Sequence, residues 1–156
     1  MKKWIYGGVV AAVYAGLTVA FAPISYGPVQ FRVSEALTVL PFLYPYTVWG
    51  LFLGCLLANY FGGLGVYDVV GGSLLTLLAG YLTSKMPKDY LAPLPPVVVN
   101  MFGVAVYLHW LFNMPYFLTA AYIGLGEGVV VYALGYPFLK WIERQKKRRG
   151  NRDGFY

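Results

Sequence analysis

Six apolar stretches, separated by short turns rich in glycine, proline and polar residues, constrain this chain more than any other feature. An α-helix needs roughly 20 apolar residues to cross a bilayer. Only 12% of the residues are charged, about half of the ~25% typical of a soluble domain. The sequence therefore predicts an all-α membrane protein with six transmembrane helices over residues 1–142 and a basic tail over residues 143–156. The stretches cover approximately residues 4–22, 32–43, 46–60, 66–84, 91–112 and 116–141.

The distribution of lysine and arginine predicts the orientation of these helices. Lys2, Lys3, Lys85, Lys88 and the basic tail fall on one side of a six-helix arrangement. The opposite loops, 24–31, 62–65 and 113–115, contain neither residue type. The positive-inside rule places both termini in the cytoplasm. We therefore interpret the net charge of +6 as a membrane flank rather than a nucleic-acid surface, with specific lipid or ribosome binding by the tail as an alternative.

Small residues recur at every fourth position on two neighbouring ridges of the first stretch. Such a pattern lets another helix approach closely. The pattern serves either packing within this protein or docking to a partner. One ridge comprises Gly8, Ala12, Gly16 and Ala20, and the other comprises Gly7, Ala11 and Ala15.

The first break between apolar stretches holds a polar segment, residues 26–35, reading Tyr-Gly-Pro-Val-Gln-Phe-Arg-Val-Ser-Glu. Arg32 and Glu35 are three residues apart, so on a helix they share one face. Charged residues between membrane-length segments are costly and mark a functional site by default. The alternative is that Arg32 and Glu35 simply pair with each other.

Further polar residues interrupt the later stretches. Asp68 either caps its own helix or contacts a ligand. Asn100 and Glu127 both lie roughly 17 Å from the outer ends of their helices. Asn100 either bonds a neighbouring helix or contacts a ligand. Glu127 is flanked by glycines at 124, 126 and 128, which leave room for a flat group, and it is the acid most expected to contact a ligand.

These side chains predict one outward-open cavity for a small molecule with several N–H donors. Tyr26, Phe31 and Tyr107 are candidates to stack on its ring, and Asn59 is a further polar candidate. The pattern indicates no metal site, and no residue is assigned a catalytic role. An intramembrane enzyme using Asp68 and Glu127 is an alternative, although these acids differ in estimated depth by about 15 Å.

Cys55 and His109 are not expected to take part in ligand binding. The single cysteine, Cys55, is expected to be a small buried residue. His109 falls on the helix face opposite Asn100, so it is not expected to bind the ligand. A phosphate-binding loop of the Gly-x-x-x-x-Gly-Lys-Ser/Thr type is missing, so ATP hydrolysis is expected in other subunits.

The segment Ser-Tyr-Gly-Pro-Val-Gln-Phe-Arg-Val-Ser-Glu-Ala-Leu at 25–37 resembles the signature of the QueT family. Gly-Cys-Leu-Leu-Ala-Asn at 54–59, and Asp68 followed by Gly-Ser-Leu at 72–74, are similar to the family as well. The resemblance implies a substrate-binding S component of an energy-coupling factor (ECF) transporter. Its substrate would be a queuosine precursor, a 7-deazaguanine such as preQ1 or preQ0. An S component for another vitamin is the alternative.

The resemblance also implies partners and location. We expect a multi-pass protein of a prokaryotic plasma membrane, an outward site covered by the first loop, a transmembrane T component and two ATPase subunits as partners, and no cofactor in this chain. S components carry an Ala-xxx-Ala docking stripe on the first helix, and the Gly8 to Ala20 ridge is similar, with two glycines in place of alanines.

The resemblance further implies roles for single residues. A deazaguanine presents two adjacent N–H donors that suit a carboxylate, so Glu127 is expected at the ring edge. Asp68 or Glu35 is expected at the ammonium of an aminomethyl group. The carbonyl and ring acceptors are expected to contact Gln30, Arg32 and Asn100.

Overall fold

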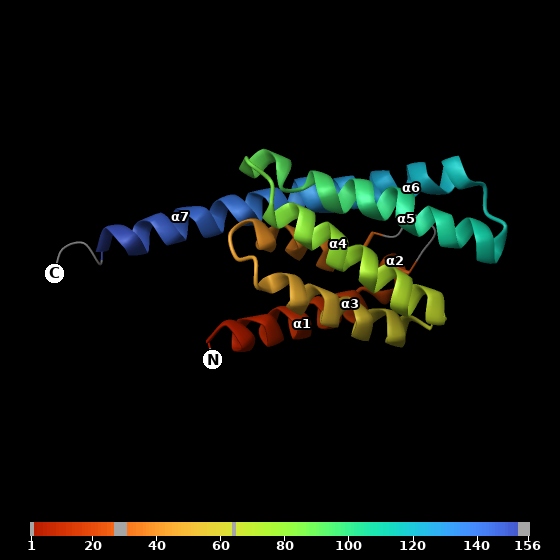
Figure 1. The fold of residues 1–156 in the computed structure, drawn as a ribbon, viewed down its shortest axis with the longest axis horizontal. Coiled ribbons are helices and arrows are strands. Elements are labelled where there is room, and N and C mark those ends of the chain that lie inside the picture. Colours follow the sequence, from red (N-terminus) through yellow and green to blue (C-terminus); the bar gives the residue numbers. More distant parts are fainter. Residues whose placement is uncertain (1, 27–30, 64, 153–156) are drawn as a thin grey trace.

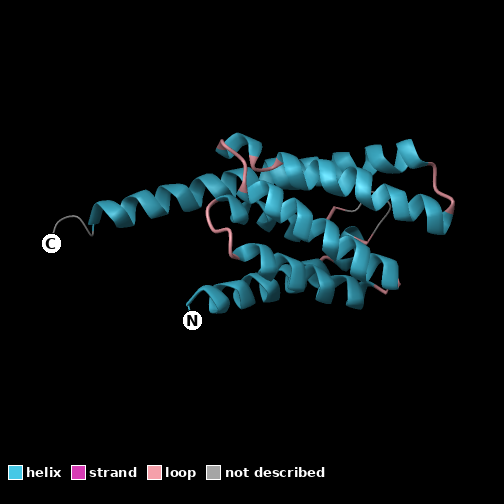
Figure 2. Ribbon diagram, in the orientation of Figure 1, coloured by secondary structure: helices cyan, strands magenta, loops and turns pink. Residues whose placement is uncertain are grey.

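The computed structural model describes residues 2–26, 31–63 and 65–152, and these residues form helices and turns without a strand (Figures 1 and 2). The prediction of an all-helical fold is confirmed. In chain order the elements are α1 (Lys2–Ala20), α2 (Ala22–Ser25), η1 (Val33–Phe42), α3 (Thr47–Gly62), η2 (Asp68–Gly72), α4 (Ser73–Ser84), η3 (Asp89–Leu91), α5 (Leu94–Phe112), α6 (Tyr116–Val130), η4 (Val131–Gly135) and α7 (Tyr136–Arg152).

Three continuous helical stretches are long and apolar enough to cross a bilayer: Lys3–Ala20, Asp89–Phe112 and Tyr116–Arg148. Two further apolar helices, Val33–Phe42 and Thr47–Gly62, are shorter. The presence of membrane-length helices agrees with the sequence analysis, whereas the count of six spans stays a prediction.

The exterior of the bundle is strongly apolar. Trp110 and Phe117 are 83% and 84% exposed, and Trp4 and Trp141 are also exposed. Exposed aromatic side chains at both ends of a bundle suit the two bilayer interfaces. A surface of this kind is stable in lipid and aggregates in water.

The helices pack around η1, which lies in the middle of the bundle (Figure 1). α1 packs on α3, α3 on α4, α4 on α5, and α5 on α6, while η1 contacts α1, α3, α4, α6 and α7. η1 is a 3-10 helix: the Glu35 amide donates to the Arg32 carbonyl at 2.9 Å. Arg32 is the extended residue that precedes this helix, so the prediction that Arg32 and Glu35 share one helix face does not apply.

The interface of α1 with α3 brings two backbones into direct contact. A Cβ added to Gly50 would lie 2.4 Å from the Gly7 carbonyl oxygen, and one added to Gly54 would lie 2.8 Å from that of Ala11. Only glycine permits this approach. The Gly7–Ala11 ridge therefore serves packing within the protein.

The other small-residue ridge of α1 is free. Gly8, Ala12, Gly16 and Ala20 are all exposed. A Cβ added to Gly8 or Gly16 would meet no atom within 4 Å. The structure thus separates the two ridges that the sequence could not distinguish. Ala15, on the first ridge, is half-buried.

The turns fall where the sequence predicts them. Gly63 and Gly65 adopt φ of +70° and +100° between α3 and η2. Asn113 adopts φ of 52° between α5 and α6. These turns and α2 lie at one end of the bundle, whereas the start of α1, the α4–α5 loop and α7 lie at the other (Figure 1).

Two helices contain a five-residue π turn, a feature frequent at functional sites. η2 leads into α4, and η4 joins α6 to α7. η4 packs against η1, and a Cβ added to Gly135 would lie 3.0 Å from the Ala36 carbonyl oxygen. η4 therefore lies directly against the central helix η1. η2 lies against α3 and α4, which in turn contact η1.

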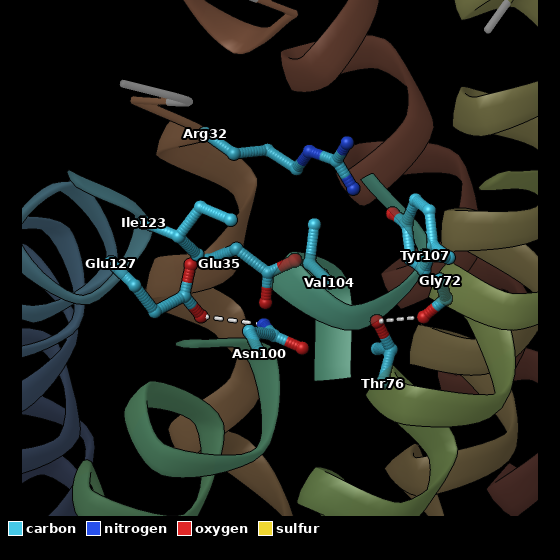
Figure 3. A pocket seen from close by; sticks show the side chains of 9 residues that line it. All are labelled: Arg32, Glu35, Gly72, Thr76, Asn100, Val104, Tyr107, Ile123 and Glu127. Carbon is cyan, nitrogen blue, oxygen red and sulfur yellow. Dashed lines mark hydrogen bonds between the residues drawn. The ribbon is translucent and has the colours of Figure 1, made fainter. Parts of the chain in front are cut away.

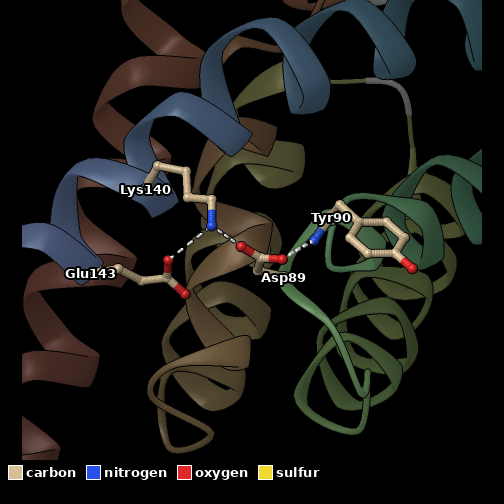
Figure 4. A network of polar contacts seen from close by, with 4 residues as sticks. All are labelled: Asp89, Tyr90, Lys140 and Glu143. Atoms are coloured by element: carbon tan, nitrogen blue, oxygen red, sulfur yellow. Dashed lines mark hydrogen bonds and ion pairs between the residues drawn. The ribbon is translucent and has the colours of Figure 1, made fainter.

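The last helix extends beyond its predicted end near residue 141. α7 continues to Arg152, so the first part of the basic tail is helical. The Lys140 ammonium donates to Asp89 and, at 3.3 Å, to Glu143 (Figure 4). The Lys140–Asp89 pair ties α7 to η3, the segment that precedes α5, whereas the pair with Glu143 lies within α7.

We predict that Gly50→Ala destabilises the protein by about 1–3 kcal/mol, because the new methyl group meets backbone that cannot move aside. Gly8→Ala is the matched control: it adds the same group to an open position and raises helix propensity. Thermal unfolding midpoints in one detergent should fall for Gly50→Ala and stay level or rise for Gly8→Ala. Equal midpoints for the two variants would contradict the α1–α3 geometry.

Candidate ligand-binding site

A polar cavity lies where η1, η2, α4, α5 and α6 meet (Figure 3). Its volume is about 10 Å³, which holds roughly one water-sized sphere. The cavity is lined by Arg32, Glu35, Gly72, Thr76, Asn100, Val104, Tyr107, Ile123 and Glu127. Five of the ten predicted substrate-binding residues are therefore brought together, from three different segments of the chain.

Glu35 sits at the start of η1 and is 2% exposed. One carboxylate oxygen, Oε1, accepts a hydrogen bond from the hydroxyl of Tyr14 on α1. The other oxygen, Oε2, is buried and has no hydrogen-bond partner among the described residues. A second bond, 2.6 Å between the Thr18 and Ser34 hydroxyls, also joins α1 to η1. Glu35 is thus held on one side and unsatisfied on the other.

Arg32 is buried without an ionic partner. None of the described carboxylates forms an ion pair with it, so the alternative in which Arg32 and Glu35 pair with each other is wrong. Its guanidinium carbon lies 5.7 Å from the centre of the Tyr26 ring, and Nη1 lies 3.9 Å from the Cys55 sulfur. Nε has no partner among the described atoms. A buried, incompletely bonded cation is costly.

Asn100 and Glu127 meet across the α5–α6 interface. The Asn100 amide nitrogen donates to Oε1 of Glu127 at 2.8 Å (Figure 3). Both side chains are buried and both line the cavity. The two alternatives for Asn100 therefore coexist, since it bonds a neighbouring helix and faces the cavity.

The glycines around Glu127 do not all make room for a ligand. A Cβ at Gly124 would lie 2.5 Å from the Met101 sulfur, so this glycine serves packing of α6 on α5. A Cβ at Gly128 would meet nothing within 4 Å, and Gly128 does not line the cavity. The expectation that these glycines clear space for a flat group is wrong at Gly124, where Met101 fills the space, and the open space beside Gly128 is not part of this cavity.

Asp68 lies behind the cavity wall. It is the acid in the first turn of η2, but neither of its carboxylate oxygens accepts a bond from a backbone amide of that helix. Its Oδ1 accepts from the Tyr107 hydroxyl at 2.6 Å, and its backbone carbonyl accepts from the Asn59 amide at 2.8 Å. Tyr107 lines the cavity, whereas Asp68 and Asn59 do not. The paired acids of the enzyme alternative, Asp68 and Glu127, therefore do not share this cavity.

The aromatic candidates separate in the structure. Tyr107 lines the cavity. Tyr26 is half-buried, donates its hydroxyl hydrogen bond to the Ala58 carbonyl and packs against Gly62. Phe31 is exposed and lies outside the cavity lining. Stacking on a ligand at this cavity by Tyr26 or Phe31 is therefore not supported by the present geometry.

Gln30 was predicted to bind the ligand, and His109 was predicted to lie away from it. Gln30, with the neighbouring residues 27–29 of the first loop, lies outside the described residues. His109 is exposed, and its Nδ1 lies 2.6 Å from the Met114 carbonyl oxygen, as expected for a residue away from the site. Across the described chain, no three His, Cys, Asp or Glu side chains group as metal ligands.

Sequence analysis missed three supporting residues. Tyr14 is a fully buried tyrosine beside the small residues of α1, and that contrast in size was the available signal. Cys55 is buried, as predicted for a small apolar residue. Its sulfur also accepts hydrogen bonds from the Thr76 hydroxyl at 3.2 Å and from the Asn59 amide at 3.4 Å. Thr76 lines the cavity itself. These residues form a polar layer beneath Arg32.

Comparison with known proteins places this site in a transporter family. A family model described as QueT transporter matches residues 4–144, which include every lining residue. The chain is 33% identical over 135 residues to the Queuosine precursor transporter QueT of Lactococcus lactis subsp. cremoris (strain MG1363), covering 76% of this chain and 79% of that relative. No solved structure shows a significant match. The chain therefore belongs to the QueT transporter family.

Proposed function

We propose that this chain is the substrate-binding S subunit of an ECF importer and that its cavity binds a 7-deazaguanine precursor of queuosine. The observation that carries the proposal is the convergence of two buried carboxyl groups, an amide and a guanidinium on one cavity. The name of the Lactococcus lactis relative supports the substrate class.

The chemistry of a deazaguanine ring matches these groups. The ring N1–H and the exocyclic amine form adjacent donors, and the ring carbonyl is an acceptor. A carboxylate accepts two parallel N–H bonds, and Glu127 is positioned for this role because Asn100 fixes its orientation. Arg32 retains an unused Nε–H donor that suits the carbonyl. Tyr107 offers an aromatic wall.

The cavity is closed around about 10 Å³, far less than a bicyclic base occupies. Substrate binding therefore requires the cavity walls to move apart, so the ligand selects a more open state of the bundle. η1 is a 3-10 helix, and a 3-10 helix has poorer hydrogen-bond geometry than an α-helix. We propose that opening occurs on this side.

The proposed topology has six membrane segments in residues 1–142, both termini in the cytoplasm and a basic tail at 143–156. It is supported by the grouping of lysine-bearing segments at one end of the bundle (Figure 1) and by the rule that basic residues stay cytoplasmic. The protein would reside in the plasma membrane of a prokaryote. ATP hydrolysis would come from two partner ATPase subunits through a transmembrane T component.

The free ridge of α1 is the proposed docking face for that T component. Its four members, Gly8, Ala12, Gly16 and Ala20, are exposed. The neighbouring ridge already packs against α3. Small residues allow a partner helix to approach closely in lipid.

The binding proposal predicts that Glu127→Gln weakens affinity for preQ1 by about 10- to 100-fold, because the amide opposes a donor to the donors of the ring. Isothermal titration calorimetry on the purified chain measures the change. Glu143→Gln, which alters a carboxylate at the far end of the bundle, is the control and should leave affinity unchanged. Full affinity in a folded Glu127→Gln protein would remove this residue from the site, and failure of wild type to bind any 7-deazaguanine would reject the function.

The docking proposal predicts that Ala12→Leu retains preQ1 affinity but loses assembly with the T component and ATPases. The added bulk keeps the partner helix away from α1. Co-purification from cells that express all subunits measures assembly. Ala121→Leu places the same change on an exposed position of α6 and should assemble normally. Equal assembly of the two variants would exclude this ridge as the docking face.

A further inference from the structure

We propose that the cavity selects a positively charged substrate and that Glu35 is the residue that reads the charge. Resting on the proposed function, this means that a 7-aminomethyl-7-deazaguanine, which is an ammonium at neutral pH, binds in preference to the neutral 7-cyano compound with the same ring. The selection follows from the charges and unmade hydrogen bonds of the cavity.

The ionisable side chains that line the cavity are unbalanced. The lining contains one guanidinium, from Arg32, two carboxyl groups, from Glu35 and Glu127, and the weakly acidic hydroxyl of Tyr107. When the guanidinium and both carboxyl groups are ionised, their formal sum is +1 − 2 = −1, and no lysine lines the cavity. Buried charge without compensation is costly. A ligand with one positive charge brings the sum to zero with both carboxyl groups ionised, whereas with a neutral ligand one carboxyl group must take up a proton to reach the same balance.

Glu35 has the free acceptor that an ammonium needs. Its Oε1 is occupied by Tyr14, and its Oε2 is buried without a partner. An ammonium offers three donors and no acceptor, and a bond between two charged groups is about twice as strong as a neutral one. Figure 3 shows the Glu35 carboxyl group inside the cavity, with the Arg32 guanidinium above it in this view.

The two acids are equipped for different parts of one ligand. Glu127 is on α6 and is aligned by the planar amide of Asn100, which suits a flat ring edge. Glu35 is on η1 and is held by a single hydroxyl. A ligand placed between these elements can contact both, with its ring toward Glu127 and its 7-substituent toward Glu35.

The geometry decides between the two candidates for the ammonium. Each acid accepts one tyrosine hydroxyl and keeps a second oxygen, Oδ2 of Asp68 or Oε2 of Glu35, buried without a partner among the described residues. The two acids differ in position, because Glu35 lines the cavity and Asp68 does not. The structure therefore assigns the role to Glu35 and leaves Asp68 as support for Tyr107.

Tyr14 is the positioning residue for this carboxylate. It is fully buried on α1, and its Cβ would lie 2.9 Å from a Cβ at Gly54, so α3 fixes its place. Its hydroxyl therefore restricts the rotamer of Glu35 and leaves Oε2 as the free oxygen. Tyr14 does not line the cavity and acts only through Glu35.

The test measures both ligands on the full chain in detergent by calorimetry. Wild type should bind the aminomethyl compound about 10- to 100-fold more tightly than the cyano compound, the range expected of a charge-assisted bond in a buried site. Glu35→Gln should bring this ratio close to one by weakening only the aminomethyl compound. Asp68→Asn should keep the ratio. Tyr14→Phe, which retains the carboxylate, should lower the ratio partly while leaving the cyano affinity unchanged.

The outcomes separate the two levels of the proposal. Equal binding of the two ligands by wild type overturns charge selection while the deazaguanine function stands. Loss of the ratio in Asp68→Asn but not in Glu35→Gln overturns the assignment of Glu35. A wild-type protein that binds neither ligand rejects the proposed function itself. Because the wild-type ratio is informative alone, the test does not depend on any variant folding.

Discussion

A carboxyl group inside a bilayer must find its hydrogen-bond donors within the protein, and the structure is organised around one that finds only half of them. Glu35 takes a hydroxyl from α1 and keeps a second oxygen unpaired in the centre of the bundle. Arg32, which lines the same cavity, also has a buried atom without a partner among the described residues, as do Ser25, Asn59 and Asp68 outside the lining. Unsatisfied polar atoms are expensive in a lipid-enclosed interior, and the two residues that line the cavity support the proposal of a polar ligand there.

The convergence of the site could be predicted from sequence because polar residues are so rare in the apolar stretches. Arg32, Glu35, Asn100 and Glu127 stood out against that background, and the structure brings them to one cavity. The spacing of Arg32 and Glu35, and the depth of Asn100 in α5 and of Glu127 in α6, indicated which parts of these segments would meet. The short glycine-rich and polar breaks between the apolar stretches likewise predicted the turns at Gly63 and Asn113.

The remaining features depend on helix rotation, which a single sequence does not specify. Rotation of η2 and α5 turns Tyr107, rather than Asp68, into the cavity. Rotation of α1 decides which of two similar ridges meets α3, and nothing in their composition separates them. Gly124 looked like space for a ligand and is instead filled by Met101. The helical continuation to Arg152 was missed because strongly charged residues were read as a boundary rather than as a solvated helix.

The π turn η4 joins α6 to α7 and changes the rotation of one helix about the common axis relative to the other. A turn of this type holds one residue more than a regular turn, and one residue corresponds to about 100° of rotation. Conversion of η4 to regular helix would therefore swing the segment bearing Lys140 and its ion pairs around the axis relative to the segment bearing Glu127. Gly135, seated against the carbonyl of Ala36, is where such a winding change would be felt by η1. The molecule thus contains a built-in angular offset between its ligand-facing and its charged end.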